Sequence, residues 1–214
     1  MIGFLGGTGP EGKGLGLRFA MAGESVILGS RDPEKGVRAA EDVRKIAPGL
    51  AITGGSNEEA ARSGDIVFVC VPYAGQRETL AALRTYLVGK VVVSAVVPLS
   101  FTAAGVRALH VEEGSAAMQA QGVLTESKVV AGFHTVSSSE LIKPYASIDS
   151  DVIVCGDDTV ARNLIIGLAE KIKGVRGVDG GGLAYAGYVE VFTAMLIGIN
   201  RTYKAHTGVR IAGI

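Results

Sequence analysis

Short apolar runs alternate with segments of helical spacing along most of the chain. The apolar runs predict strands at 2–6, 25–29, 51–53, 65–71, 90–97, 128–133, 151–156 and 175–178. Helical spacing between them predicts helices at 10–22, 33–46, 75–87, 114–121 and 158–172. Continuous Val and Ile runs separated by helices are typical of a parallel sheet covered on both faces. The pattern therefore predicts an α/β fold with a doubly wound parallel sheet of the Rossmann kind.

The run "DGGG" at 179–182 is the clearest break in this pattern. We expect residues 1–180 to form a nucleotide-binding domain and residues 181–214 a small helical domain that closes the cofactor cleft. The helix expected at 183–206 carries apolar residues on more than one face: Val189, Val191, Phe192, Met195, Leu196 and Ile199. Such a helix needs cover on several sides, so the sequence predicts a homodimer.

Composition narrows the class of protein. A chain of 214 residues with 48% hydrophobic and 20% charged positions can bury a core, and its zero net charge argues against a nucleic-acid partner. The apolar stretch at 191–199 is about half of the roughly 20 residues that a membrane span needs, so no membrane partner is expected. The first strand starts at Ile2 and leaves no room for a signal peptide. With Cys70 and Cys155 interpreted as reduced core residues, we expect a cytoplasmic protein.

The glycine cluster "GGTGPEGKG" at 6–14 follows the first strand directly. Gly7, Gly9 and Gly12 fit the G-x-G-x-x-G pattern of dinucleotide-binding turns, in which a helix N-terminus meets a pyrophosphate. The letters also nearly spell a P-loop through Lys13, but Gly14 stands where a magnesium-binding hydroxyl is required. A dinucleotide site is therefore favoured over a nucleotide triphosphate site, with a turn that binds nothing as the remaining alternative.

The run "LGSRDPEK" after the second strand bears on which dinucleotide binds. Asp32 lies where an acid would hold the ribose of NAD, but Pro33 directly after it indicates a helix N-cap instead. Ser30, Arg31 and Lys35 offer a hydroxyl and two cations to a 2′-phosphate. We therefore expect NADP.

Other candidate site residues follow the later strands. Val71 and Pro72 end one strand, and Val97 and Pro98 end another, where they could form apolar walls. His134 ends a third strand and is expected to project into the crevice, although a structural role is an open alternative. The histidines have no further ligands at fixed spacing, so no metal site is expected.

Six stretches together resemble the F420-dependent NADP reductases: the glycine cluster with its helix, "ILGSRDPEK", "VPY", "VVPL", "GFHTVSS" and "VIVCGDD". The resemblance implies NADP on a Rossmann domain, with the deazaflavin coenzyme F420 stacked against it. Carried over by position, it implies NADP contacts from Thr8, Gly9, Pro10, Glu11, Ser30, Arg31 and Lys35. It likewise implies ring contacts from Val71, Pro72, Val97 and Pro98, and deazaflavin contacts from His134 and Thr207.

The function expected from these residues is hydride transfer between NADP(H) and F420, with His134 orienting the acceptor. Direct transfer between two rings needs proximity more than a general base, and no acid–base pair stands out in the sequence. An alternative is an NADP-dependent reductase of a hydroxy acid, imine or flavin, in which Asn200 and Lys204 bind substrate. A second alternative is a non-catalytic NADP(H)-binding sensor.

Overall fold

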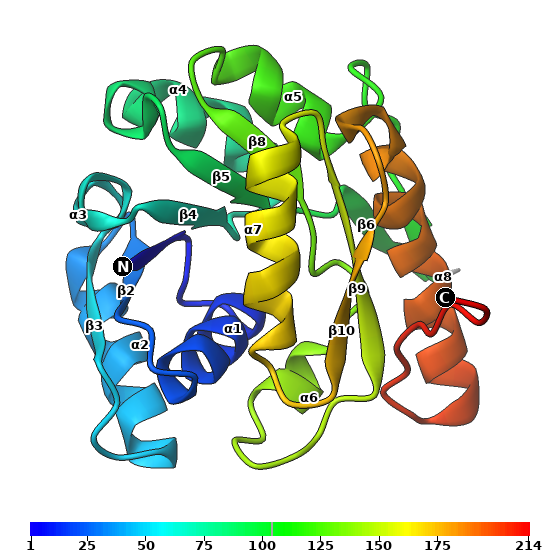
Figure 1. Ribbon diagram of the computed structural model, residues 1–214, viewed down its shortest axis with the longest axis horizontal. Coiled ribbons are helices and arrows are strands. Elements are labelled where there is room, and N and C mark those ends of the chain that lie inside the picture. Colours follow the sequence, from blue (N-terminus) through cyan, green and yellow to red (C-terminus); the bar gives the residue numbers. More distant parts are fainter. Residues whose placement is uncertain (104) are drawn as a thin grey trace.

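The computed structural model describes residues 1–103 and 105–214, which build one large sheet between layers of helices (Figure 1). Its eight strands lie in the order β10-β9-β8-β5-β4-β1-β2-β3. They are β1 (Ile2–Leu5), β2 (Val26–Ser30), β3 (Ile52–Ser56), β4 (Ile66–Val69), β5 (Val91–Ser94), β8 (Lys128–Ala131), β9 (Ser150–Gly156) and β10 (Val175–Asp179). The helices are α1 (Pro10–Met21), α2 (Pro33–Ile46), α3 (Asn57–Ser63), α4 (Gln76–Leu87), α5 (Ala116–Val123), α6 (Ser138–Leu141), α7 (Thr159–Glu170) and α8 (Ala186–Tyr203). Short 3₁₀ turns, η1 (Tyr73–Gly75) and η2 (Leu183–Tyr185), precede α4 and α8.

Six neighbouring strands, from β8 to β3, are parallel, and their order reverses at β1, as in dinucleotide-binding folds. The predicted doubly wound α/β fold is thus confirmed. The sheet departs from a parallel arrangement at one edge, where β9 pairs antiparallel with β8 at Ala131↔Cys155 and β10 pairs parallel with β9. A parallel strand would need a crossover connection that leads the chain back to the other end of the sheet. In the described chain between β8 and β9, the only helix is the single turn of α6, and β9 runs in the opposite direction to β8.

Buried Arg18 holds that connection in place. Its guanidinium donates hydrogen bonds to the main-chain oxygens of Leu141 (2.7 Å), Ala146 (2.8 Å) and Glu140 (2.8 Å), and also to that of Lys143. A buried cation is tolerated here because four carbonyl groups take the place of its water. The 137–146 segment is thereby fixed against α1, close to the ends of the parallel strands.

Four elements have no counterpart in the sequence prediction. α3 begins at a capping box in which Ser56 and Glu59 bond each other's main-chain N–H groups, and α6 is a single turn. β6 (Leu99–Thr102) and β7 (Gly105–Ala108) form a separate antiparallel pair. All four are short, so periodicity gives little signal for them.

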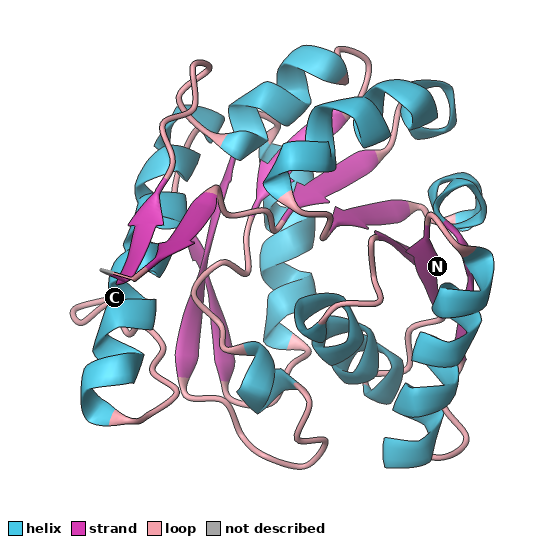
Figure 2. Cartoon of the chain, turned by 180° about the vertical axis from the view of Figure 1, so that it is seen from behind, coloured by secondary structure: helices cyan, strands magenta, loops and turns pink. Residues whose placement is uncertain are grey.

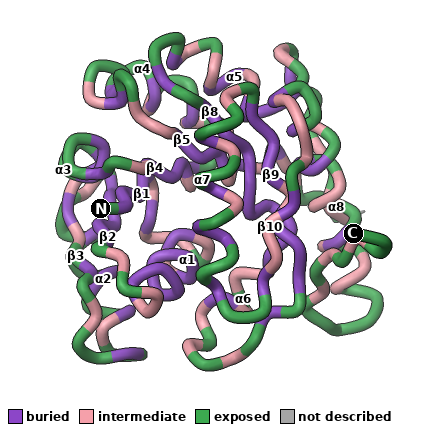
Figure 3. The backbone as a smooth tube through the Cα atoms, viewed as in Figure 1, coloured by how far each residue is buried: buried purple, intermediate pink, exposed green. Residues whose placement is uncertain are grey.

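The core is divided by the sheet into two layers, and buried residues follow the strands through the molecule (Figure 3). One layer packs α1, α2 and α7 around an aromatic cluster in which Phe4 and Phe68 stack at 4.9 Å and Phe133 meets Phe68 edge-on. The other layer packs α3, α4 and α5 with Leu183 and Val189 of the last helical segment. Helices thus cover both faces, as the view from behind also shows (Figure 2).

The last helical segment, Leu183–Tyr203, lies along the edge of the molecule beside the β6–β7 pair (Figure 1). Val189 and Leu196 are buried, whereas Val191 and Met195 are more than half exposed. The segment has 21 residues and contains an 18-residue stretch with a mean hydropathy of 1.3. It therefore meets the length and composition of a membrane span, a test that core helices of soluble proteins also pass. Apolar positions on two faces, as the sequence predicts, are therefore present in α8.

Candidate functional site

A pocket of about 670 Å³ opens at the carboxyl ends of β1, β2 and β4. Its lining comes from the glycine turn, the end of β2 and the chain after β4: Gly6, Thr8, Gly9, Ser30, Arg31, Asp32, Lys35, Asn57, Cys70, Val71, Pro72, Ala74, Gly75, Glu78 and Thr79. Ligands of open α/β sheets bind at this edge, where the strand order reverses. A neighbouring hollow of about 340 Å³ shares Ser30 and Arg31 and extends along α3 and α4.

The glycine turn is shaped by two close approaches and one open position. The Gly7 N–H donates to the Gly29 oxygen at 2.9 Å, and a Cβ on Gly12 would lie 2.5 Å from the Gly7 Cα. A Cβ on Gly9 would meet nothing within 4 Å, so its lack of a side chain leaves room above the backbone. Gly9 caps α1 without a side-chain bond, which leaves the first N–H groups of the helix available to an anion.

Asn57, at the start of α3, supports this turn from the end of β3, which lies two strands away from β1 in the sheet. Its side-chain oxygen accepts a hydrogen bond from the Gly6 N–H at 2.9 Å, and the residue lines the pocket. The sequence analysis missed Asn57. The only available signal was the capping pattern of Ser56 and Glu59, which marks the helix and not the contact across the sheet.

The end of β2 carries the two candidate phosphate-binding cations. Asp32 is the N-cap of α2, where its carboxylate accepts from the Glu34 N–H at 3.1 Å, which confirms its predicted structural role. Arg31 and Lys35 are exposed at the pocket rim, and among the described residues neither side chain has an ion-pair partner. By contrast, Lys13, the residue of the rejected P-loop interpretation, lies 3.8 Å from Asp42 and is not part of the lining.

A second cavity, of about 320 Å³, lies at the ends of β5 and β8 and against α8. Its lining is Glu11, Ala95, Val97, Phe133, His134, Thr135, Val136, Ser137, Ser138, Thr193, Leu196, Ile197, Asn200 and Thr207. His134 is only 7% exposed, and neither ring nitrogen has a hydrogen-bond partner among the described residues. Burial lowers the pKa of His134 to about 4, and the nearby main-chain oxygen of Ser94, which does not meet hydrogen-bond geometry, only partly offsets this shift, so the imidazole is neutral at pH 7.

Backbone strain next to His134 helps to fix its direction. Phe133 is buried with φ = 70°, a left-handed conformation that a bulky side chain adopts only when its surroundings impose it. The Thr193 hydroxyl of α8 lies 3.1 Å from the His134 main-chain oxygen. The β8 end is thus held between the aromatic core and α8, and the imidazole lines the cavity.

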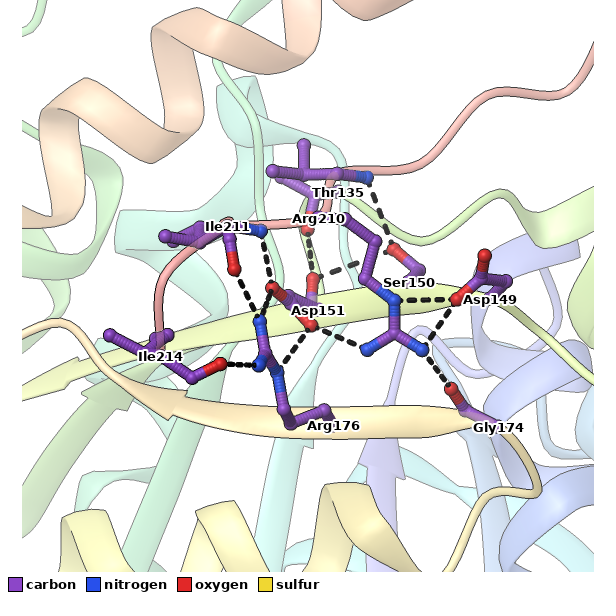
Figure 4. A network of polar contacts seen from close by, with 10 residues as sticks. Thr135, Asp149, Ser150, Asp151, Gly174, Arg176, Arg210, Ile211 and Ile214 are labelled. Carbon is purple, nitrogen blue, oxygen red and sulfur yellow. Dashed lines mark hydrogen bonds and ion pairs between the residues drawn. The ribbon is translucent and has the colours of Figure 1, made fainter.

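The chain after α8, residues 204–214, returns to the sheet and is anchored on Asp151 (Figure 4). This buried carboxylate accepts hydrogen bonds from Arg176 at 2.9 and 2.6 Å, from Arg210 at 2.7 Å and from the Ile211 N–H at 2.7 Å. These donors hold the pKa of Asp151 far below its usual range despite burial. Thr207 in this segment donates from its N–H (2.6 Å) and its hydroxyl (2.7 Å) to the side-chain oxygen of Asn200, at the second cavity.

Comparison with known proteins identifies the family. Residues 1–98 match the family described as NADP oxidoreductase, coenzyme F420-dependent. The chain is 41% identical to the F420-dependent NADP reductase of Methanothermobacter thermautotrophicus, over 100% of this chain and 95% of the relative. The protein of the same name from Methanocaldococcus jannaschii is also 41% identical, over 100% of this chain and 98% of the relative.

The chain belongs to the F420-dependent NADP reductase family. The resemblance inferred from the sequence motifs is therefore confirmed. A solved structure from Arthrobacter sp. fb24, described as a candidate F420-dependent NADP reductase, superimposes with a TM-score of 0.85 over 99% of both chains. At 23% identity, that likeness shows the shared fold.

Within this reductase fold, the expected site residues fall into two groups. Thr8, Gly9, Ser30, Arg31, Lys35, Val71 and Pro72 line the first pocket, and Glu11, Val97, His134 and Thr207 line the second cavity. Gly7 and Gly12 are buried beneath the turn, and Pro10 is exposed at the first position of α1. Pro98 lines neither space, and its main-chain oxygen accepts from Leu109 at the base of the β6–β7 pair.

Two residues of this site differ from the sequence predictions: one lies in the other cavity, and one was not predicted. Glu11, expected beside NADP, lines the second cavity together with His134. Thr193, which contacts the His134 backbone, was missed because it lies 59 positions away and its spacing suggests only a helix. Among residues 1–103 and 105–214, no three His, Cys, Asp or Glu side chains gather where they could hold a metal ion.

Proposed function

We propose that this protein transfers a hydride between NADP(H) and the deazaflavin coenzyme F420. The observation that carries the proposal is the pair of spaces at one edge of the sheet. Within the described part of the chain, one has an open glycine turn and cations without ion-pair partners, and the other has a buried imidazole without hydrogen-bond partners. The names of the full-length relatives from two methanogens support the same pair of substrates.

The first pocket fits NADP(H). The open position above Gly9 and the uncapped start of α1 suit a pyrophosphate, since helix N-termini bind anions through free N–H groups. Arg31 and Lys35 suit a 2′-phosphate, with Ser30 at the end of β2 beside them. Val71 and Pro72 would form the apolar wall nearest the nicotinamide.

The second cavity fits the deazaflavin ring, because its unpartnered imidazole can bond to the polar edge of that ring. When both substrates are bound, the two rings supply the redox chemistry, and the hydride moves directly between them. The protein then has to hold the rings in contact and exclude water. His134 is neutral at pH 7, so it orients the acceptor by a hydrogen bond and does not act as a fixed charge.

The geometry favours this function over a hydroxy-acid or imine reductase. That alternative needs Asn200 and Lys204 to face a substrate. The side-chain oxygen of Asn200 already accepts two hydrogen bonds from Thr207, and Lys204 is exposed and outside the cavity lining. Asn200 is therefore arranged to fix the C-terminal segment.

The direct test is an absorbance assay of the purified protein with NADPH and three acceptors offered in turn: F420, FMN and FAD. We expect NADPH oxidation with F420 and little with the two flavins. Equal rates with all three acceptors would refute specificity for the deazaflavin, and no oxidation with any acceptor would favour the sensor alternative.

The nucleotide preference is tested by calorimetry on the double variant Arg31→Ala with Lys35→Ala. Charge-assisted hydrogen bonds contribute about 1.5–3 kcal/mol each, so NADPH binding is expected to weaken by roughly two orders of magnitude or more. NADH affinity is expected to change little. An equal loss for both nucleotides would mean that these residues serve folding instead of phosphate recognition.

We further propose that residues 181–214 act as a small helical domain that closes the cleft and pairs with a second copy of the chain. The exposed face of α8 and its 3₁₀ turn carries Tyr185, Tyr188, Val191 and Met195, each more than half exposed. The charged residues of α8 are Glu190, which is buried, and Arg201 in the last turn. An aromatic, uncharged face suits an identical copy, because self-pairing brings no like charges together.

Light scattering at micromolar concentration tests the homodimer. Met195→Glu is expected to give a monomer, whereas the control Val160→Glu, at a residue 75% exposed on α7, should leave the dimer intact. A monomeric wild-type protein would refute the proposal. The two cysteines are free in the structure, which supports a reducing, cytoplasmic location as part of the same proposal.

A further inference from the structure

Glu11 is the second residue of α1, and its side chain lines the cavity that contains His134. The residue is partly exposed, but its Oε1 atom is sealed from solvent and has no hydrogen-bond partner among the described residues. The Nδ1 and Nε2 atoms of His134 share that condition. Two polar groups without partners therefore line one small cavity, where each would need a bond from a ligand.

Among residues 1–103 and 105–214, no cation forms an ion pair with Glu11. Cys70, directly after β4, is half-buried, and the pKa of its thiol is raised by desolvation and by Glu11. Lys13, on the same helix as Glu11, lies 3.8 Å from Asp42 of α2. Glu140 of α6 is paired with Lys143 at 2.7 Å. Burial raises the pKa of Glu11 to about 8, so at pH 7 the carboxyl group retains its proton.

We propose that Glu11 donates a hydrogen bond from a neutral carboxyl group to the ring that occupies the second cavity. The inference rests on the proposed function. A neutral acid beside a neutral imidazole offers one O–H donor together with one N–H donor and one acceptor nitrogen. That set matches a ring edge on which carbonyl and N–H groups alternate, as on the pyrimidinedione edge of a deazaflavin. Glu11 thus selects for the substrate of the second cavity.

The neighbouring pocket reinforces the same protonation state. Glu11 is two residues from Gly9, where the open backbone suits a pyrophosphate. Negative charge bound there disfavours an ionised carboxylate nearby. Binding of NADP is therefore expected to draw a proton onto Glu11 at a pH where the free protein has partly lost it.

The first test titrates oxidised F420 into the protein without nucleotide, so that no turnover occurs, and follows ligand fluorescence from pH 6.5 to 9.5. Glu11→Gln, which retains an N–H donor, is expected to bind at pH 7 within a few-fold of wild type. Glu11→Leu should bind on the order of five- to tenfold more weakly. Wild-type affinity relative to the Gln variant should fall as the pH rises above about 8, where the O–H donor is lost. Titration of the ligand itself is common to both proteins and cancels in that ratio.

A Glu11→Leu variant that binds F420 as well as wild type would overturn the inference, as would a wild-type to Gln ratio that does not change with pH. NADPH affinity and the unfolding temperature of each variant verify that it is folded. If wild-type protein does not bind F420 at all, the proposed function fails. If all three proteins bind F420 equally, only the role of Glu11 fails.

The second test measures NADP⁺ binding calorimetrically at pH 8 in buffers of different ionisation enthalpy. Wild type is expected to take up as much as about half a proton more than Glu11→Gln, because the bound nucleotide completes the protonation of a half-titrated carboxyl. The 2′-phosphate titrates equally in both proteins. Equal proton numbers would overturn the inference.

Discussion

Replacing Asp151 by Asn is expected to release the C-terminal segment, residues 204–214, from the sheet. The carboxylate is fully buried and accepts two hydrogen bonds from Arg176, one from Arg210 and one from the Ile211 N–H. Asn has nearly the same shape but no charge, and its NH₂ group faces donors where an acceptor is needed. Breaking this cluster leaves the Arg176 guanidinium without its counter-ion and leaves Arg210 with only the exposed carboxylate of Asp149.

The expected loss of stability follows from the burial of the Asp151 carboxylate. Removing one partner of a buried ion pair costs about 3–5 kcal/mol. Here the side chains of Arg176 and Arg210 are 34% and 41% exposed and can regain water, so the lower end, about 3 kcal/mol, applies. For a chain of this size, about 3 kcal/mol corresponds to a fall in unfolding temperature of roughly 6–12 °C.

Two measurements check the prediction. Thermal unfolding gives the global loss, and amide hydrogen exchange reports the release of residues 204–214 directly. Because Thr207 in this segment lines the second cavity, F420 binding is expected to weaken while NADPH affinity stays near wild type. As a control, Arg210→Ala removes one partly exposed donor and should cost less than Asp151→Asn.

The pH dependence gives an independent check. The pKa of Asp151 is lower in the folded protein than in the unfolded chain, so its stabilising contribution is present above about pH 4 and is lost as the pH falls further. The stability difference between wild type and Asp151→Asn should therefore shrink from pH 7 to pH 3. A variant with an unchanged unfolding temperature and unchanged exchange in residues 204–214 would refute the reasoning.

Three further outcomes are expected. Gly9→Val should fold normally and lose nucleotide binding. Gly12→Ala should lose about 1–3 kcal/mol of stability or more, because its Cβ would lie 2.5 Å from the Gly7 Cα. Urea unfolding and NADPH titration of both variants separate the two effects. His134→Ala should weaken F420 binding and slow single turnovers, while NADPH affinity stays unchanged. His134→Asn should recover part of the lost activity, and an Asn variant as inactive as the Ala variant would indicate a proton-transferring histidine. The Glu190 carboxylate accepts hydrogen bonds from two N–H groups of α5, and burial raises its pKa to about 7. Wild-type stability should therefore fall as the pH rises from about 4.5 to 7. Urea unfolding of Glu190→Gln should show no such slope, and a slope that persists would contradict the assignment.

Local chemistry explains what the sequence by itself determined. The glycine turn, the Asp32 N-cap and α2 from Pro33 to Ile46 depend on residues within a few positions of one another, and all are found where the pattern predicts them. Continuous apolar runs likewise identified the strands of the buried sheet, because only burial on both faces tolerates them. The family followed from the same short motifs.

Contacts between distant positions were decided by tertiary structure alone. The connection that precedes the antiparallel strand β9 packs against Arg18, more than 100 residues earlier. The Asp151 cluster joins positions 25 and 59 residues apart, and Asn57 reaches the glycine turn from 51 residues away. No periodicity encodes such pairs.

The protonation states of the candidate site also belong to the tertiary structure. The sequence supplied a glutamate beside a glycine turn and a histidine after a strand, both of which would titrate normally in water. Packing of α1, β8 and α8 around one cavity removes water from Oε1 of Glu11 and from the His134 ring. Desolvation then favours the neutral form of each, because a charge in a low-dielectric interior costs more free energy than a neutral polar group.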